Sequence, residues 1–135
     1  MYHSTKEARD KILKEAKTIA VVGLSDKKER TSYQVSKIMQ EAGYKIIPVN
    51  PKADEILGEK AVASLSEIKE PVDIVNVFRR SEFLPELAHE FLEMDANAFW
   101  AQLGVSNEEA YELLKETHPV VMDYCIKVAY QELAK

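Results

Sequence analysis

Thr18-Ile-Ala-Val-Val-Gly-Leu-Ser25 is the stretch that decides the fold, and Tyr44-Lys-Ile-Ile-Pro-Val-Asn-Pro51 completes its pattern. Each is a short apolar run that ends in turn residues, and a segment with helical spacing lies between them. This order predicts the strand–loop–helix–strand unit that opens a nucleotide-binding α/β sheet, in which the first loop holds a phosphate. Only Gly23 remains of the usual phosphate-loop glycines, and no acidic residue ends the second run. The pattern therefore favours a nucleotide-like anion and argues against NAD.

Length and composition fit one soluble domain. The 135 residues are 46% hydrophobic and 30% charged, which is ordinary for a globular protein. The net charge of −5 argues against general nucleic-acid binding. No apolar run approaches the roughly 20 residues that span a bilayer, and the polar start lacks the apolar core of a signal peptide. The single cysteine, Cys125, excludes an internal disulfide framework. We expect a cytoplasmic protein with no membrane or nucleic-acid partner.

Strand and helix patterns alternate to the end of the chain. Besides the two runs above, taken as strands 18–22 and 44–49, strands are expected at 60–63, 73–78, 98–101 and 120–122. Helices are expected at 5–17, from Thr31 or Ser32 to Gly43, at 84–92, after Ser106 and at 124–133, with one helical turn at 64–67. This alternation predicts an α/β fold, a doubly wound parallel sheet of five to six strands in one three-layer αβα domain spanning 1–135. The expected strand order is 3-2-1-4-5, with the sixth strand at the edge. Residues 1–4 are expected to fray.

Capping residues mark the helix starts. Ser4 with Glu7 and Ser106 with Glu109 have the spacing of capping boxes, and Thr31 or Ser32 is the expected N-cap of the second helix.

Ligands of doubly wound sheets lie beyond the carboxyl ends of the strands. The residues that follow the first strand are Gly23, Ser25 and Arg30, and those that follow the second are Asn50, Pro51 and Lys52. Arg79 follows the strand expected at 73–78, and Gln102 and Gly104 follow the strand expected at 98–101. Six basic residues collect there: Lys27, Lys28, Arg30, Lys52, Arg79 and Arg80. Positive charge beside a helix N-terminus predicts a polyphosphate site.

Structural roles compete with these assignments. Gly23 also suits a tight turn, Ser25 a loop hydrogen bond, and Lys52 an ordinary surface position. The pair Lys27 and Lys28 reads as a solvated charge run. The group Phe78, Phe99 and Trp100 is expected in the core rather than as a stacking platform.

No catalytic or metal-binding arrangement is expected. His3, His89 and His118 are scattered and lack metal-ligand spacing. Cys125 begins the last helix, a position that favours a reactive thiol. The competing interpretation is a small buried apolar side chain.

Five segments in order carry a family resemblance: Ile19-Ala-Val-Val-Gly-Leu-Ser25, Gly43-Tyr-Lys-Ile-Ile-Pro-Val-Asn-Pro51, Asp73-Ile-Val-Asn-Val-Phe-Arg79, Trp100-Ala-Gln-Leu-Gly104 and Val120-Val-Met-Asp-Tyr-Cys125. Together they resemble the small stand-alone CoA-binding proteins of bacteria and archaea over residues 8–133. The fold of that family is similar to the N-terminal CoA-binding domain of succinyl-CoA synthetase α subunits. The resemblance implies a Rossmann-like domain that holds CoA across its strand ends.

The resemblance also implies ligand roles by position. Gly23 and Ser25 would hold the pyrophosphate, and Arg30 and Lys52 would face phosphates, with the 3′-phosphate at Lys52. Val49, Asn50 and Pro51 would line the adenosine side. Phe78 and Arg79 would flank the nucleotide. Gln102 and Gly104 would lie along the path of the pantetheine arm. The sequence departs from the family pattern at four positions, where Leu24 replaces alanine, Thr31 proline, Tyr124 arginine and Ala129 glutamate.

We therefore expect a module that binds coenzyme A or an acyl-CoA and has no catalytic activity of its own. The alternative is an NADP-binding small reductase or redox-sensing regulator, because CoA and NADP both carry a phosphorylated ribose that Lys52 would favour. A third possibility is a thiol-linked function in which Cys125 forms a mixed disulfide with CoA.

Overall fold

Five parallel strands form the central sheet of the computed structural model, which describes residues 4–133. Their order is β2 (Lys45–Val49), β1 (Thr18–Val22), β5 (Val72–Val77), β6 (Ala96–Ala101) and β7 (Val120–Val121). The predicted doubly wound α/β fold is thereby confirmed. His3 and most of the segment expected to fray lie outside the described residues. Ser4 is described, and its carbonyl and hydroxyl oxygens both accept hydrogen bonds from Arg9.

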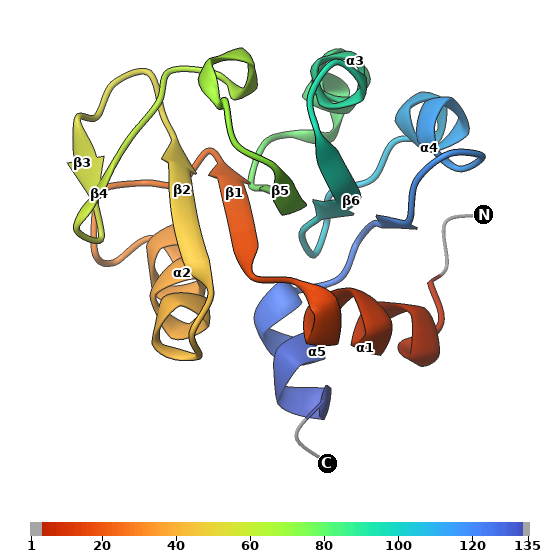
Figure 1. The fold of residues 1–135 in the computed structure, drawn as a ribbon, viewed down its shortest axis with the longest axis horizontal. Coiled ribbons are helices and arrows are strands. Elements are labelled where there is room, and N and C mark those ends of the chain that lie inside the picture. The colour runs from red at the N-terminus through yellow and green to blue at the C-terminus, as the bar shows by residue number, and fades with distance from the viewer. Residues whose placement is uncertain (1–3, 134–135) are drawn as a thin grey trace.

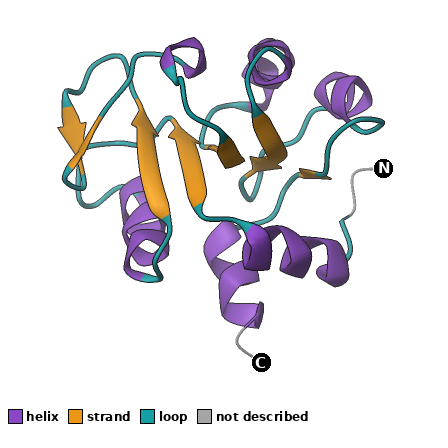
Figure 2. Ribbon diagram, in the orientation of Figure 1, coloured by secondary structure: helices purple, strands orange, loops and turns teal. Residues whose placement is uncertain are grey.

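Helices cover both faces of the sheet (Figure 1). One layer contains α1 (Lys6–Glu15), α2 (Thr31–Glu41) and α5 (Ile126–Leu133). The other contains the short 3₁₀ helix η1 (Leu65–Glu67), α3 (Leu84–Leu92) and α4 (Glu108–Leu114). Figure 2 shows the same three layers, with the strands between the two groups of helices. None of the helices within residues 4–133 is long and apolar enough to cross a membrane.

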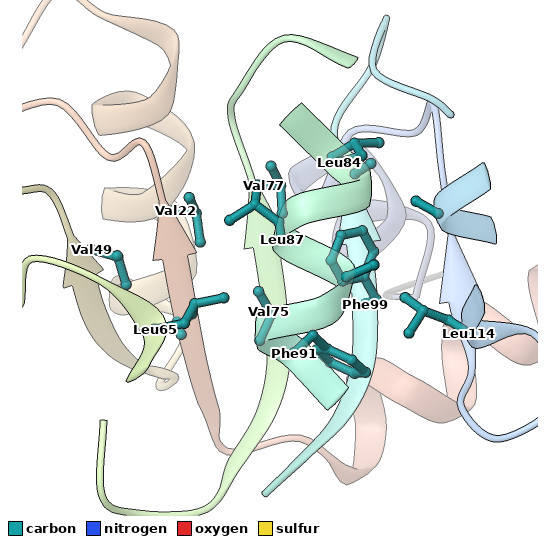
Figure 3. Close-up of a cluster of buried hydrophobic side chains, with 14 of the residues drawn as sticks. Val22, Val49, Leu65, Val75, Val77, Leu84, Leu87, Phe91, Phe99 and Leu114 are labelled. Carbon is teal, nitrogen blue, oxygen red and sulfur yellow. The ribbon is translucent and has the colours of Figure 1, made fainter. Parts of the chain in front are cut away.

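Alternating residues of each strand feed two separate cores. In β1, Ile19 and Val21 face the α1, α2 and α5 layer, whereas Ala20 and Val22 face α3. Figure 3 shows Leu87 and Phe91 of α3 among the side chains that rise from the sheet. Burying each large apolar side chain contributes roughly 1.5–3 kcal/mol. Of the three aromatic residues predicted in the core, Phe99 and Trp100 are fully buried, whereas Phe78 is only half-buried.

The strand expected at 60–63 is reduced to one bridge between Val62 and Val49. Val62 donates to the Pro48 carbonyl and accepts from Asn50, but extending this ladder toward the start of β2 would need an N–H from residue 48. Proline has none. The chain instead forms a hairpin of β3 (Glu55–Ile56) and β4 (Glu59–Lys60) that the sequence reading missed. Leu57 and Gly58 at its turn both have positive φ.

The helix starts differ from the predicted caps. The N-cap of α1 is Thr5, whose hydroxyl accepts from the Ala8 N–H, rather than Ser4. Asn107 caps α4 in the same way, and Ser106 does not. The N-cap position of α2 is Arg30, without a side-chain cap. The predicted stop of α2 at Gly43 is confirmed, because Gly43 adopts the left-handed conformation after the C-cap Ala42.

Candidate functional site

Two pockets open at the carboxyl ends of the strands, and Arg79 lines both. The charged pocket, of about 390 Å³, is lined by Val22, Gly23, Val49, Asn50, Pro51, Lys52, Ala63, Ser64, Leu65, Arg79, Leu87 and Glu90. The apolar pocket, of about 680 Å³, is lined by Thr31, Phe78, Arg79, Arg80, Ser81, Gln102, Leu103, Gly104, Val105 and Cys125. Both volumes are in the range of small-molecule sites.

Gly23 lets the first loop leave β1 against the backbone of β5. Its φ is +83°, and a Cβ there would lie 2.4 Å from the Phe78 carbonyl oxygen. The Gly23 N–H donates to the Val49 carbonyl, and the Phe78 N–H donates to the Val22 carbonyl. Glycine is therefore required for the close approach of three strand ends, which brings the walls of the charged pocket together.

The loop after Gly23 is held by side chains from neighbouring elements. Asn50 donates its amide N–H to the Leu24 carbonyl and accepts from the Lys52 N–H. The Ser25 N–H donates to the hydroxyl of buried Ser32, and the Ser25 hydroxyl accepts from the Lys27 N–H. The amide of Asn50 thus fixes the loop and the start of the Lys52 segment, a scaffold role that the sequence did not indicate.

Three charged side chains line the charged pocket without ion-pair partners among residues 4–133. Lys52 is exposed and its ammonium forms no hydrogen bond or ion pair. The Arg79 guanidinium stacks 4.2 Å from the centroid of the Phe83 ring, an arrangement that orients the cation without neutralising it. Glu90, half-buried on α3, is the third charged group. Two cations without ion-pair partners beside apolar walls can contact the oxygens of an anion that enters the pocket.

The environment of Glu90 opposes its ionisation. Burial raises the pKa of the Glu90 carboxyl, the charges of Glu86 and Glu93 raise it further, and only Arg79 acts in the opposite direction. A carboxylate in this setting is stabilised by any hydrogen-bond donor that enters the pocket.

Two polar side chains that line the apolar pocket, those of Gln102 and Ser81, are bonded to the backbone. Gln102 is buried, and its side-chain oxygen accepts from the Ile126 N–H at the start of α5. The Ser81 hydroxyl accepts from the Ser106 N–H, and the Asp123 carboxylate accepts from the Gly104 N–H. These bonds join the loops after β5, β6 and β7 to one another. Leu103, which is 72% exposed, stands at the pocket rim.

Cys125 lies on the same wall, directly before α5, and is half-buried. The preceding turn is anchored by buried Trp100, whose indole N–H donates to the Tyr124 carbonyl at 2.7 Å. The Tyr124 ring lies under the Arg9 guanidinium, and its hydroxyl donates to Glu132, a bond that raises the pKa of Tyr124.

The structure brings most of the predicted ligand residues together, but not all of them. The charged pocket contains Gly23, Val49, Asn50, Pro51, Lys52 and Arg79, and the apolar pocket contains Phe78, Arg79, Gln102, Gly104 and Cys125. Ser25 and Arg30 line neither pocket. Whether any of these residues contacts a ligand remains a prediction.

Some lining residues were missed. Ser64 follows the weak bridge at Val62, so the rule of strand ends would have found it. Leu87 and Glu90 reach the charged pocket from the side of α3, and Leu103 is an apolar residue in a loop. No local sequence signal marks Leu87 and Glu90, because their positions depend on how the elements pack, whereas Leu103 lies between Gln102 and Gly104, where the rule of strand ends applies.

Comparison with known proteins shows which family the chain resembles. A model of the CoA binding domain family matches residues 17–131. The chain is 63% identical over 131 residues to the uncharacterized protein YneT of Bacillus subtilis, covering 96% of this chain and 97% of that protein. It is also 26% identical over 113 residues to an ADP-forming acetate–CoA ligase of Methanocaldococcus jannaschii, covering 83% of this chain but 16% of that enzyme.

Solved structures show the same fold. A protein from Thermus thermophilus superimposes with a TM-score of 0.90 at 38% identity, covering 96% of this chain and 99% of that one. A hypothetical protein from Pyrococcus horikoshii superimposes with a TM-score of 0.93 at 31% identity, covering 100% and 96%. The fold and the matched sequence lead to one conclusion: the chain belongs to the CoA binding domain family.

Proposed function

We propose that this protein binds coenzyme A or an acyl-CoA across the two pockets. The observation that carries the proposal is the pair of unneutralised cations, Lys52 and Arg79, at the strand ends of a chain from this family. CoA carries its phosphates at one end and an extended, weakly polar pantetheine arm at the other. The charged pocket suits the phosphorylated nucleoside, and the apolar pocket suits the arm.

Arg79 is the connection between the two halves of the proposed site, since it lines both pockets. We place the 3′-phosphate at Lys52 and the pyrophosphate between Gly23 and Arg79. The adenosine would lie against Val49 and Pro51. The pantetheine arm would then run past Phe78 toward Gln102 and Gly104.

We propose a binding role without a reaction of its own. The match to the Methanocaldococcus jannaschii ligase covers 16% of that enzyme, so the similarity is to one part of it. No activity is carried over to this chain from a match of that extent.

The test is calorimetry with CoA, acetyl-CoA, dephospho-CoA, NADP and NAD, preceded by thermal unfolding with each ligand. A ligand at about 100 times its Kd stabilises the folded state by roughly 2.7 kcal/mol. We expect stabilisation by CoA and weaker binding of dephospho-CoA. Stabilisation by NADP and not by CoA would favour the alternative, an NADP-binding small reductase or redox-sensing regulator. No response to either ligand would overturn the proposal.

Cys125 gives the site a second candidate use, because its side chain lines the pocket assigned to the pantetheine arm. Its thiolate would attack the disulfide of oxidised CoA, forming a Cys125–CoA disulfide and releasing one CoA thiolate. Intact-protein mass spectrometry after incubation with oxidised CoA tests this, with Cys125→Ser as the control. An absent adduct on the wild-type protein would exclude the covalent use and leave the binding proposal standing.

A further inference from the structure

Glu90 is the unexplained group of the charged pocket. A carboxylate repels phosphate, yet Glu90 lines the same pocket as Lys52 and Arg79. It forms no hydrogen bond or ion pair with any other residue in 4–133. Lys69, which lines an adjoining hollow with Glu90, donates to the Ser66 carbonyl instead.

The charges around Glu90 make an unpaired carboxylate unfavourable there. Burial removes part of the hydration of Glu90, and Glu86, one turn earlier on α3, and Glu93, after α3, both repel its charge; the attraction of Arg79 offsets only part of this. A half-buried anion with no partner is stabilised by a donor from outside the chain. The ligand is therefore expected to bring an N–H or O–H group to this position.

The walls of the pocket indicate which part of the ligand supplies that donor. Val49, Pro51, Leu65 and Leu87 are apolar and suit the faces of a flat ring. Phosphates are drawn to Lys52 and Arg79 and repelled by Glu90. The donor must then belong to the edge of the base rather than to a group beside the phosphates.

We propose that Glu90 is a specificity residue that accepts a hydrogen bond from the exocyclic 6-amino group of adenine. This rests on the proposed CoA function and deepens it by naming the base that the charged pocket selects. Adenine presents a donor at that position. Hypoxanthine presents an oxygen acceptor of the same size, which Glu90 would repel.

The experiment compares CoA with the analogue that carries hypoxanthine in place of adenine, by calorimetry at pH 7.5. A hydrogen bond to a charged group is worth a factor of roughly 10 to 100 in affinity. The wild-type protein should therefore prefer CoA by at least about tenfold. In Glu90→Ala this preference should fall to roughly unity, mainly through weaker binding of CoA.

Two further variants make the test specific. Glu90→Gln keeps the shape and offers both an acceptor and a donor, so it should lose the preference by binding the hypoxanthine analogue more tightly than the wild type does. Glu86→Ala, exposed and outside the pocket, should keep the wild-type preference. Glu90→Gln carries the test if Glu90→Ala does not fold.

The outcomes distinguish a failure of the Glu90 role from a failure of the proposed CoA binding. Tight binding of CoA with no preference over the analogue, or a preference that Glu90→Gln retains, would overturn the role of Glu90 alone. If the wild-type protein binds neither ligand, the CoA proposal fails and the role of Glu90 fails with it.

Discussion

The charged pocket and the apolar pocket meet at Arg79, but they differ in the side chains that they present. Lys52, Arg79 and Glu90 line the charged pocket with no ion pair among residues 4–133. At the apolar pocket, Gln102 and Ser81 are bonded to the backbone of neighbouring loops. The comparison teaches that Lys52 and Glu90 in the charged pocket are left unpaired within the described part of the chain, whereas Gln102 and Ser81 in the apolar pocket hold neighbouring loops together. Substitutions should therefore reduce affinity in the first pocket and stability in the second.

Gly23 is the exception in the charged pocket, because it acts on the fold. Gly23→Ala should destabilise the protein by more than about 2 kcal/mol, since it adds a backbone clash to an unfavourable positive φ. Gly104 is the matched control: its φ is also +83°, but nothing lies within 4 Å of a Cβ there. Gly104→Ala should lose only about 1–2 kcal/mol. Equal losses in denaturant unfolding would show that the approach to Phe78 does not matter.

Gln102 tests whether side chains of the apolar pocket stabilise the fold. Gln102→Ala leaves the buried Ile126 N–H without its acceptor and should lower the free energy of unfolding by about 1–3 kcal/mol. Gln131, exposed on the same helix, is the control, and Gln131→Ala should change stability by less than about 0.5 kcal/mol. A Gln102→Ala protein as stable as the wild type would contradict the scaffold role.

Cys125 reports on occupancy of the apolar pocket. If the pantetheine arm lies there, CoA at about ten times its Kd should slow alkylation of Cys125 by iodoacetamide roughly tenfold, in line with the free fraction. Adenosine 3′,5′-bisphosphate, which lacks the arm, should leave the rate nearly unchanged. Equal protection by both compounds would mean that the thiol senses the charged pocket and not the arm.

The smallest expected effect is the pH dependence of stability at Glu90. The pKa of Glu90 is raised in the folded protein above its usual value of about 4.3. The stability that the protonated Glu90 carboxyl contributes is therefore fully present below that usual value and is lost as pH rises through the raised pKa. Glu90→Gln removes this loss. The variant should match the wild type near pH 4 and exceed it at pH 7 by less than about 1 kcal/mol. A difference in melting temperature that does not grow with pH would contradict the environment described for Glu90.

The sequence predicted the fold and the edge at which the two pockets open, because both depend on short-range pattern. Apolar runs with turn residues at their ends mark β1 and β2, and the ends of parallel strands meet at one edge. Gly23, Lys52 and Arg79 could be named for that reason. Ser25 was named by the same rule; its N–H donates to Ser32 at the start of α2, it lines neither pocket, and its role stays a prediction.

Long-range packing accounts for what the sequence did not predict. Glu90 enters the site from the side of a helix, and Asn50 bonds a loop that lies before it in the chain. Tyr124 is another case, because its ring packs under Arg9, which lies far from it in the chain.

The central claim is that this edge of the sheet binds CoA with its 3′-phosphate at Lys52. The most direct measurement is a calorimetric cycle of the wild type and Lys52→Ala, each titrated with CoA and dephospho-CoA. Charge-assisted hydrogen bonds of this kind are worth roughly 1.5–3 kcal/mol, so the wild type should prefer CoA by at least about tenfold and Lys52→Ala by less than about threefold. A wild-type protein that does not bind CoA, or a variant that keeps the full preference, would contradict the account.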